Sequence, residues 1–558
     1  MYYNYLLAEL FLHKQFSRYI HQHGGKKKKT VKWHSFCHNG LKFPPVYGEH
    51  NIPVIYDGEK INLSGKAEEL ATLYARYTGT DYIKNKVFRK NFWKDWKKVL
   101  GDNNLIKDLD KCDFSLIYEY LLDEKEKRNL MTKEEKQKIK DNREKEDKKY
   151  KTAIVDGVEQ PVGNFRVEPP GLFMGRGCHP KMGRVKKRIL PEDITINIDR
   201  ECKIPDSIDG HKWGKIIHDN TVEWLASWYE PITGKTKYVW LGNQSKFKAK
   251  SDVSKFDLSK KLKSKVKRIR RINEDNLTDP DIKIRQIATA MYFVDYLALR
   301  VGNEKGADTA DTVGVSSLRV EHIMLLSNYE VKLDFLGKDS IRYVKSFKVC
   351  ESVYKNLKEF VYGKDKTDQL FDKISSNDIN KYLQSFMKDL TAKVFRTFNA
   401  SYLFQKEICK LDKKINNLPE DDNQKINMLL DGFNKANLKV AILCNHQKQV
   451  SKTFKQQIEN IDNMIKTQRK RLRKIKKIQK NQDRIDKIRK RIAELKAKKD
   501  MKIQLKNISL ETSKANYIDP RITVAFMKRH DINMDKIFSR ALQNKFHWAF
   551  DIDKDYKF

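Results

Sequence analysis

The chain has 558 residues, which is too long for one ordinary hydrophobic core, so we expect two to four domains. Hydrophobic residues make up 39% of it, and the formal net charge is +40 at pH 7. Such an excess of positive charge favours nucleic acid as the partner, because phosphates neutralise the self-repulsion and release counterions. A Lys-rich solvated surface is the alternative. No apolar run approaches 18 residues, which excludes a membrane-spanning helix.

Cysteine spacing bears on the compartment. The seven cysteines are Cys37, Cys112, Cys178, Cys202, Cys350, Cys409 and Cys444. They lie far apart and form no CxxC pair. This spacing argues against a disulfide framework and against a structural zinc site, and it favours a reducing compartment.

The first half of the chain mixes helical and strand patterns. Residues 1–30, which contain a run of four lysines at 26–29, are expected to be a disordered extension. Helical apolar spacing follows at 67–77 and 84–99. The almost wholly charged stretch 123–151 predicts one exposed, salt-bridged helix. Beyond Pro169-Pro170-Gly171, short β-rich segments at 221–225 and 237–241 predict strands.

The second half is mostly helical, with one predicted hairpin. Residues 284–299 have the spacing of an amphipathic helix. Two β-rich segments, 331–336 and 340–344, flank Gly-Lys-Asp, so we expect a hairpin with Lys338 at its tip.

Residues 451–506 differ from the rest of the chain. Apolar residues recur every three, four or seven positions in two sets whose phase breaks near 481–483, which predicts two helices folded back on each other. Residues 466–502 hold 18 Lys or Arg against 4 Asp or Glu, a net charge of +14. The sequence leaves two roles open for this helix pair: a passive spacer, or a segment that contacts phosphates.

Tyr517 is the most informative single residue, because it follows that basic stretch within Ser-Lys-Ala-Asn-Tyr-Ile-Asp-Pro-Arg at 513–521. A phenol titrates near pH 10 and is a weak nucleophile unless cations stabilise the charge that develops. Attack on a phosphodiester also needs donors for the non-bridging oxygens and an acid for the leaving oxygen. Arginine suits the first role and lysine the second.

Four other residues in unusual local contexts could supply these groups: Arg300, Lys338, Arg396 and His446. Each has an ordinary structural explanation when taken alone. The chain holds 114 Lys or Arg residues, so any single one of them is most often an ordinary surface charge. His446 follows an apolar run, a position in which a histidine is usually buried and hydrogen-bonded within the core.

Taken together, these segments closely resemble the eukaryotic type IB DNA topoisomerases, and the likeness covers residues 31–558. Further segments that carry it are Pro-Pro-Gly-Leu-Phe at 169–173, Gly-Arg-Gly at 175–177, His-Pro-Lys-Met-Gly at 179–183, Ala-Asp-Thr-Val-Gly at 310–314 and Lys-Phe at 545–546.

The resemblance implies a reaction and a site. Tyr517 attacks a DNA phosphate to give a 3′-phosphotyrosine and a free 5′-hydroxyl, Lys338 protonates the leaving 5′-oxygen, and rotation before religation relaxes positive and negative supercoils without ATP, metal or another cofactor. The resemblance gives three residues, Arg300, Arg396 and His446, the role of holding phosphate oxygens.

The resemblance also implies supporting contacts near the cleaved phosphate, where camptothecin-type inhibitors intercalate in relatives. The matching residues are Arg176, Asp339, Thr512 and Asn516. Met174 stands where relatives carry an arginine, which puts one phosphate or inhibitor contact in doubt.

The implied fold is a multidomain α+β protein, a bi-lobed clamp around double-stranded DNA that acts as a monomer in the nucleus. It comprises a mixed α/β cap at 31–245, a mostly helical catalytic lobe at 246–449, an antiparallel coiled-coil linker at 450–506 and a small helical C-terminal domain at 507–558. A basic lining predicts weak sequence preference and salt-sensitive binding.

Three alternatives remain. A tyrosine recombinase or integrase uses a similar Arg, Lys, His and Tyr set. A non-catalytic basic DNA-binding protein predicts that Tyr517→Phe changes nothing. A metal-dependent nuclease predicts loss of activity in EDTA.

Overall fold

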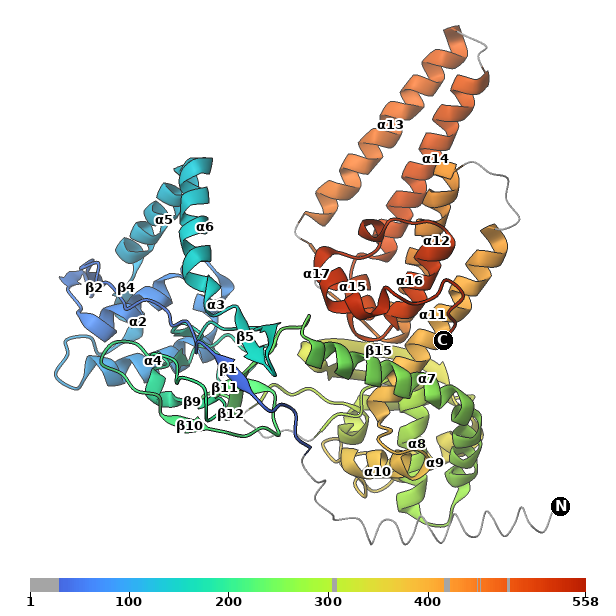
Figure 1. Cartoon of the computed structure of the whole chain (residues 1–558), viewed down its shortest axis with the longest axis horizontal. Helices are drawn as coiled ribbons and strands as arrows, with labels where there is room; N and C mark the ends of the chain where they lie inside the picture. The colour runs from blue at the N-terminus through green and yellow to red at the C-terminus, as the bar shows by residue number, and fades with distance from the viewer. Residues whose placement is uncertain (1–29, 304–308, 416–421, 449, 452, 479–481) are drawn as a thin grey trace.

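The computed structural model describes residues 30–558 except 304–308, 416–421, 449, 452 and 479–481, so all but the last residue of the predicted extension lies outside the described part. About half of the described chain is helical and the remainder includes five small sheets, which confirms a multidomain α+β protein. In Figure 1 the part of the chain up to residue 245 (blue to green), called the N-terminal third below, lies to one side of the helical remainder, 246–558 (green to red).

The N-terminal third contains four of these sheets. Their strand orders are β1-β5-β6, β3-β2-β4, β7-β8 and β10-β9-β11-β12, and each pair is antiparallel except β9 with β10. The strands are β1 Phe36–His38, β2 Val54–Tyr56, β3 Glu59–Ile61, β4 Cys112–Asp113, β5 Thr152–Val155, β6 Val158–Pro161, β7 Gly171–Leu172, β8 Val185–Lys186, β9 Ile194–Asn197, β10 Lys215–Ile217, β11 Trp224–Glu230 and β12 Lys235–Trp240.

This third has two separate cores, and its helices pack on the sheets through one of them. One core gathers the aromatic face of α4 around Phe92, whose ring stacks on Tyr74 with 4.2 Å between ring centroids. The other lies under β9 and β11, around Ile196 and Leu225. The helices are α2 Gly65–Ala75, α3 Asp81–Lys84, α4 Lys86–Leu100, α5 Ser115–Leu130 and α6 Lys133–Lys148.

Helices α2 and α4 confirm the predictions at 67–77 and 84–99. The charged stretch at 123–151 is different, because it spans the end of α5 and all of α6 rather than one helix. Met131 leaves the helical conformation, and Thr132 starts α6 with a capping box closed by Glu135. A strong N-cap inside a uniformly charged run divides it into two helices.

The strand predicted at 221–225 begins later, at Trp224 in β11. The preceding residues turn instead, because the Asp219 carboxylate accepts hydrogen bonds from the backbone N–H and the hydroxyl of Thr221, at 2.9 and 2.5 Å. The strand predicted at 237–241 is confirmed by β12.

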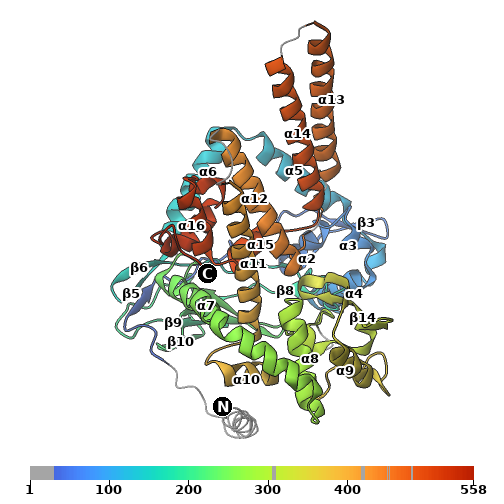
Figure 2. The same ribbon diagram turned by 90° about the vertical axis from the view of Figure 1, so that its right-hand side faces the viewer.

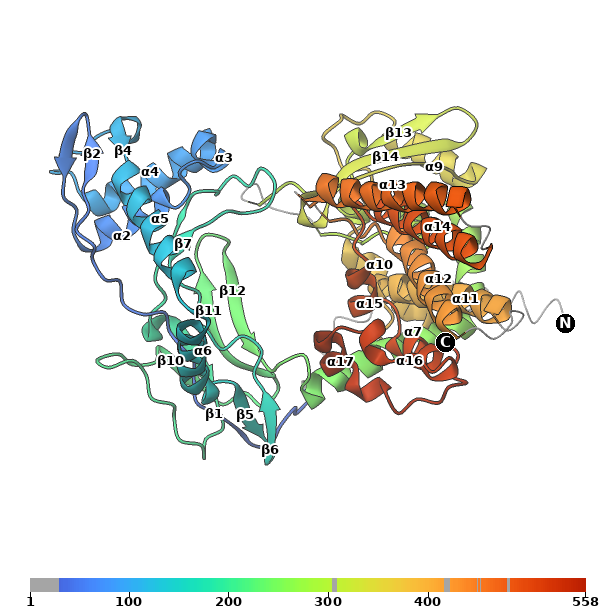
Figure 3. The same cartoon turned by 90° about the horizontal axis from the view of Figure 1, so that it is seen from above.

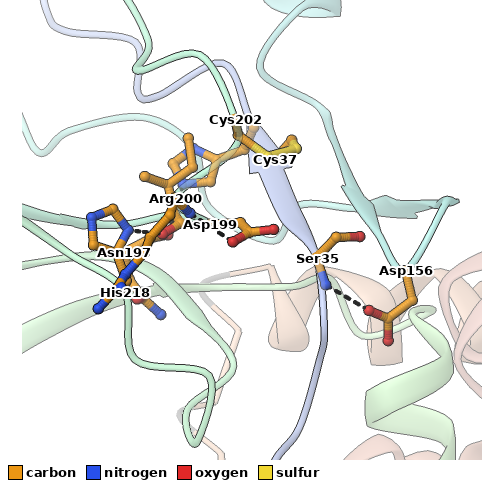
Figure 4. The surroundings of a disulfide bond; sticks show 10 residues. Ser35, Cys37, Asp156, Asn197, Asp199, Arg200, Cys202 and His218 are labelled. Atoms are coloured by element: carbon orange, nitrogen blue, oxygen red, sulfur yellow. Dashed lines mark hydrogen bonds between the residues drawn. A yellow bond between two sulfur atoms is a disulfide. The ribbon is translucent and has the colours of Figure 1, made fainter.

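The expectation of unpaired cysteines is wrong for one pair. Cys37 and Cys202 form a disulfide although 165 residues separate them (Figure 4). The two cysteines meet because the turn after β9 lies against β1, where Asp199 N donates to Phe36 O at 2.9 Å. Sequence spacing carries no trace of such a tertiary contact. The other five cysteines are free.

The helical remainder holds one large core that joins residues between Leu262 and Cys444 to residues between Ile518 and Phe558. Phe433 of α12, for example, lies 5.7 Å from Phe526 of α16 between ring centroids. The long helices cross one another in Figure 2. The helices of this part, long and short, are α7 Lys246–Asp275, α8 Ile282–Tyr296, α9 Glu351–Val361, α10 Ser376–Phe386, α11 Ala392–Ile415, α12 Asp422–Leu443, α13 Phe454–Ile478, α14 Gln482–Gln504, α15 Leu510–Asn516, α16 Pro520–Arg529 and α17 Arg540–Phe546.

A three-stranded sheet, β13-β14-β15, carries the predicted hairpin. Its strands are β13 Ile323–Leu326, β14 Glu330–Gly337 and β15 Ile341–Lys348. The turn between β14 and β15 is Lys338–Ser340, so Lys338 occupies the predicted tip.

Helices α13 and α14 confirm the two predicted helices, and the predicted phase break falls partly on the undescribed residues 479–481. They pack on each other in antiparallel fashion through a small core of their own, which contains Ile461, Ile488 and Leu495. Lys499 near the end of α14 pairs with Asp462 near the start of α13 at 2.6 Å. No helix in the described chain is long and apolar enough to cross a membrane.

Candidate active site

Tyr517 lies at the C-terminal end of α15, with its ring against two of the predicted site residues. The ring stacks on the His446 imidazole with 5.1 Å between centroids, and the Arg396 guanidinium carbon lies 4.9 Å from its centroid. The Tyr517 N–H donates to Ser513 O at 3.0 Å, and its carbonyl accepts from Ser401 Oγ at 2.9 Å. Its backbone is therefore held from both sides.

Arg396 is a buried cation on α11, with 4% of its surface exposed. Its two terminal nitrogens donate to the carbonyls of Ala298 and Cys444. Its Nε hydrogen-bonds no residue in the described part of the chain. A buried guanidinium with an unused donor is suited to an anionic ligand, because arginine keeps its charge on burial and binds phosphate through several N–H groups.

Arg300 lies in the loop after α8 and hydrogen-bonds the Tyr517 side chain. Burial and, next, the nearby Arg396 lower its pKa, so two cations are held close together beside the phenol. The loop is fixed by Val315 N, which donates to Arg300 O at 2.9 Å. Such a pair of cations repels itself and favours a bound anion.

Two glycines let that loop pass close to the chain behind it. A Cβ on Gly314 would lie 2.5 Å from the Gly302 backbone, and Gly302 has φ = 84°, a conformation that favours glycine. The close approach of Gly302 and Gly314, each preceded by a valine, thus holds the Arg300 loop in place.

His446 follows α12 and contacts both Arg396 and the tyrosine helix. Its Nδ1 lies 2.7 Å from Ser513 Oγ, and its Nε2 lies 3.5 Å from a terminal nitrogen of Arg396. Burial and then the charges of Arg396 and Arg300 lower its pKa to about 3, so the imidazole is neutral at physiological pH. Ser509 N donates to His446 O at 2.8 Å, which joins the start of α15 to this segment.

A cavity of about 1020 Å³ brings most of the predicted site residues together. Those that line it are Arg300, Lys338, Asp339, Arg396, Thr512, Asn516 and Tyr517. His446 is not in the wall but lies behind it, against Arg396 and Tyr517. Sequence positions that span more than 200 residues are therefore gathered on one surface.

Arg176 lines a neighbouring cavity of about 980 Å³, together with Lys338, Asp339 and Met174. It pairs with Asp339, so the N-terminal third touches the hairpin turn of the remainder. Gly177 lies beside the same turn, where a Cβ would come 2.6 Å from Ser340 Oγ. Figure 3 shows the two parts approaching each other here.

A group of lysines that no sequence motif marks lies around Asp252, next to the tyrosine helix. Lys255 lies 3.1 Å from the Asp252 carboxylate, and Lys545 donates to Ala515 O at 2.7 Å. Burial, as the largest cause, lowers the pKa of both lysines. Lys248 and Lys393 line the same cavity. In a chain so rich in lysine no local signal distinguishes these four, although Lys545 lies in a segment that the resemblance includes.

Ser513 and Ser401 were also missed as contacts of the candidate residues, because serine in a helix is common and only the tertiary structure shows what it bonds. In the described residues no group of three or more His, Cys, Asp or Glu side chains is placed to hold a metal ion.

Three family models match almost the whole chain. Residues 31–241 match the DNA binding fragment of eukaryotic DNA topoisomerase I, residues 244–479 its catalytic core, and residues 489–558 the C-terminal topoisomerase domain.

Individual relatives agree with these matches. DNA topoisomerase 1 beta of Arabidopsis thaliana is 43% identical over 94% of this chain and 59% of its own length. DNA topoisomerase 1 of Caenorhabditis elegans is 43% identical over 96% of this chain and 69% of its own length. The human protein of that name is 41% identical over 95% and 72%. The chain thus spans less than two thirds of the plant relatives. The resemblance seen in the sequence is confirmed, and the chain belongs to the eukaryotic, type IB DNA topoisomerase I family.

Proposed function

We propose that this chain relaxes supercoiled DNA by cutting one strand through a covalent bond to Tyr517, letting the DNA rotate and resealing it. One observation carries the proposal: two arginines and a histidine from three other segments converge on the ring and hydroxyl of Tyr517. A phenol needs this electropositive environment to attack a phosphodiester near neutral pH.

In the proposed reaction the Tyr517 oxygen bonds to phosphorus as its phenolic proton passes to water. The bond between phosphorus and the 5′-oxygen breaks, and Lys338 delivers a proton to that oxygen. Arg300, Arg396 and His446 hold the non-bridging oxygens, where negative charge builds in the transition state. Religation reverses these steps, and the phosphotyrosine bond conserves the energy of the phosphodiester, so the reaction needs no ATP or metal.

Arg176, Asp339, Thr512 and Asn516 are the supporting contacts in this proposal. Thr512 and Asn516 share the wall of the Tyr517 cavity, while Arg176 and Asp339 form an ion pair at its neighbour. The half-buried lysines Lys255 and Lys545 add positive charge to the same surface.

We also propose that the chain closes around duplex DNA as a monomeric clamp. The cap comprises 31–245, the catalytic lobe 246–449, a coiled-coil linker 450–506 and a C-terminal domain 507–558. The contact between Arg176 and Asp339 supports closure, since it joins the first part to the second. The family is typically nuclear, and we propose the same location for this chain, which imaging of a fluorescent fusion tests.

The decisive experiment is relaxation of a negatively supercoiled plasmid in EDTA without ATP. Wild type is expected to relax it, and Tyr517→Phe to bind the plasmid with unchanged affinity but leave it supercoiled. Trapping the covalent adduct and sequencing its DNA end is expected to show the protein on the 3′ end. Relaxation by Tyr517→Phe would contradict the proposal and favour a different nucleophile, and activity that EDTA abolishes would favour a metal-dependent nuclease.

A further inference from the structure

Ser513 lies between the two residues on which the proposed chemistry depends most. It is fully buried in α15, one turn before Tyr517. Its hydroxyl oxygen lies 2.7 Å from His446 Nδ1, and its carbonyl accepts the Tyr517 N–H at 3.0 Å. One serine therefore links the ring of the histidine to the backbone of the tyrosine.

The contact decides which ring nitrogen of His446 carries the proton. A neutral imidazole has one N–H donor and one acceptor nitrogen. His446 is neutral because burial and two arginines lower its pKa to about 3. A proton on Nδ1 makes Nε2 an acceptor, whereas a proton on Nε2 makes it a donor. Only the second form offers an N–H to a phosphate oxygen on the Arg396 side of the ring.

Two neighbours favour opposite forms. Arg396 can only donate, so its terminal nitrogen, 3.5 Å away, favours an unprotonated Nε2. At that distance the hydrogen bond is weak. Ser513, at 2.7 Å, is at the optimal length for a hydrogen bond.

The Ser513 hydroxyl can donate or accept, and its burial decides between the two. Within the described part of the chain, His446 Nδ1 is the one hydrogen-bond partner that this hydroxyl has. If Nδ1–H donated to the serine, the hydroxyl proton would be buried without an acceptor, which is unfavourable. If the serine donates to Nδ1, the hydroxyl proton and the Nδ1 lone pair are both satisfied, and the Nε2–H is left for an acceptor that a ligand supplies.

We infer that Ser513 is a positioning residue, which by donating its hydroxyl proton to Nδ1 keeps His446 in the form with its proton on Nε2. The inference rests on the proposed function, because it gives His446 the correct donor for a phosphate oxygen before DNA binds. Arg396 and the phosphate oxygen then lie on the same side of the ring. The site is thus prepared without a charge on the histidine.

The tautomer can be read directly in the full chain. With ¹⁵N-labelled histidine, the His446 ring signals are identified by their loss in His446→Gln. Wild type is expected to show Nε2 protonated, and Ser513→Ala to shift the ring toward Nδ1–H, because Arg396 then becomes the stronger partner. A proton on Nδ1 in the wild-type protein would overturn the inference.

Kinetics separate positioning from a structural role. In single-turnover cleavage of a nicked suicide duplex, Ser513→Ala is expected to be about 10- to 100-fold slower than wild type, with DNA affinity unchanged. Ser513→Thr keeps the hydroxyl and is expected to recover most of the rate. In a His446→Gln background, where the side-chain amide donates without a tautomer, Ser513→Ala is expected to cause no further loss.

The matched control is Ser401→Ala, which removes a hydroxyl that bonds the Tyr517 carbonyl from the opposite side. The decrease in cleavage rate that Ser401→Ala causes is expected to be the same with His446 and with His446→Gln. If Ser513→Ala behaved like this control, Ser513 would be a structural serine and the inference would fail. In that case the proposed function would still hold as long as wild type relaxes plasmid and Tyr517→Phe does not. Failure of the inference can therefore be distinguished from failure of the proposed function.

Discussion

The N-terminal third and the helical remainder are stabilised in different ways. The N-terminal third divides its buried residues between two small cores and adds a disulfide. In the helical remainder one large core joins residues between Leu262 and Cys444 to residues between Ile518 and Phe558, and only the α13–α14 pair has a small core of its own. A continuous core holds distant segments in fixed relative positions, because close-packed interiors deform little. Arg300, Arg396, His446 and Tyr517 all belong to the part with that core. The N-terminal third reaches the same surface through Arg176, at the Arg176–Asp339 contact.

This difference predicts unequal consequences for two arginines. Arg396→Ala removes a buried donor beside Tyr517 and is expected to slow single-turnover cleavage by about 10²–10³-fold. Arg176→Ala removes an exposed ion pair between the two parts and is expected to slow cleavage by less than about 10-fold. Parallel rate measurements on a suicide duplex check both. Equal losses would show that the N-terminal third belongs to the reacting centre.

Reduction of the disulfide is expected to destabilise the N-terminal third alone. A cross-link between distant residues stabilises by roughly 2–4 kcal/mol, chiefly by restricting the unfolded chain. Cys202→Ser, or reducing agent, is therefore expected to raise hydrogen exchange around β1 and β9 while exchange in α11 and α16 stays unchanged. Thiol titration of the oxidised protein should find five free thiols. Faster exchange in both parts would show that they unfold as one unit.

Two buried histidines predict how acid affects each part. Burial lowers the pKa of His38 to about 4, and burial with two arginines lowers that of His446 to about 3. Since the unfolded chain binds these protons near pH 6.5, stability falls as pH drops below that value toward the folded pKa.

Each histidine is expected to lower the free energy of unfolding by about 2 kcal/mol between pH 7 and pH 5. His446→Gln is expected to flatten the pH dependence of exchange in the helical remainder, and His38→Gln that of the N-terminal third. Urea unfolding followed by hydrogen exchange at pH 7 and pH 5 measures both. A pH slope that neither substitution changes would contradict the assignment to these groups.

The smallest expected effect concerns the basic helix pair. Positive charge on α13 is expected to slow DNA rotation by attracting the duplex, so neutralising Lys470, Lys474 and Lys477 to Gln should speed relaxation and lower processivity by a few fold at low salt. The control neutralises Lys136, Lys138 and Lys140 on α6, which belongs to the N-terminal third. If the α13 variant relaxes plasmid at the wild-type rate and processivity, the braking role is wrong.

Periodicity predicted the secondary structure well where local interactions decide it. The α4 helix has Phe88, Phe92 and Trp96 on one face and an asparagine cap, and the hairpin around Lys338 has its turn residues in place. The prediction failed at 123–151, where Thr132 caps a second helix, and before β11, where Asp219 makes a turn. In both places a single side chain bonding the backbone outweighed the pattern of the segment.

The family and the identities of the candidate residues could be predicted from the sequence alone, because the order of the motifs and the residue types within them can be read without a structure. Their convergence could not, since a contact between Tyr517 and Arg396 or His446 depends on packing over more than 70 residues of chain. Three further features could not be predicted from the sequence because they also depend on the tertiary structure. They are the neutral state of His446, which results from burial, the contact of the Ser513 hydroxyl with its ring, and the disulfide between Cys37 and Cys202. Sequence specifies which groups are available, whereas distance and desolvation, which arise only in the folded chain, decide how they act.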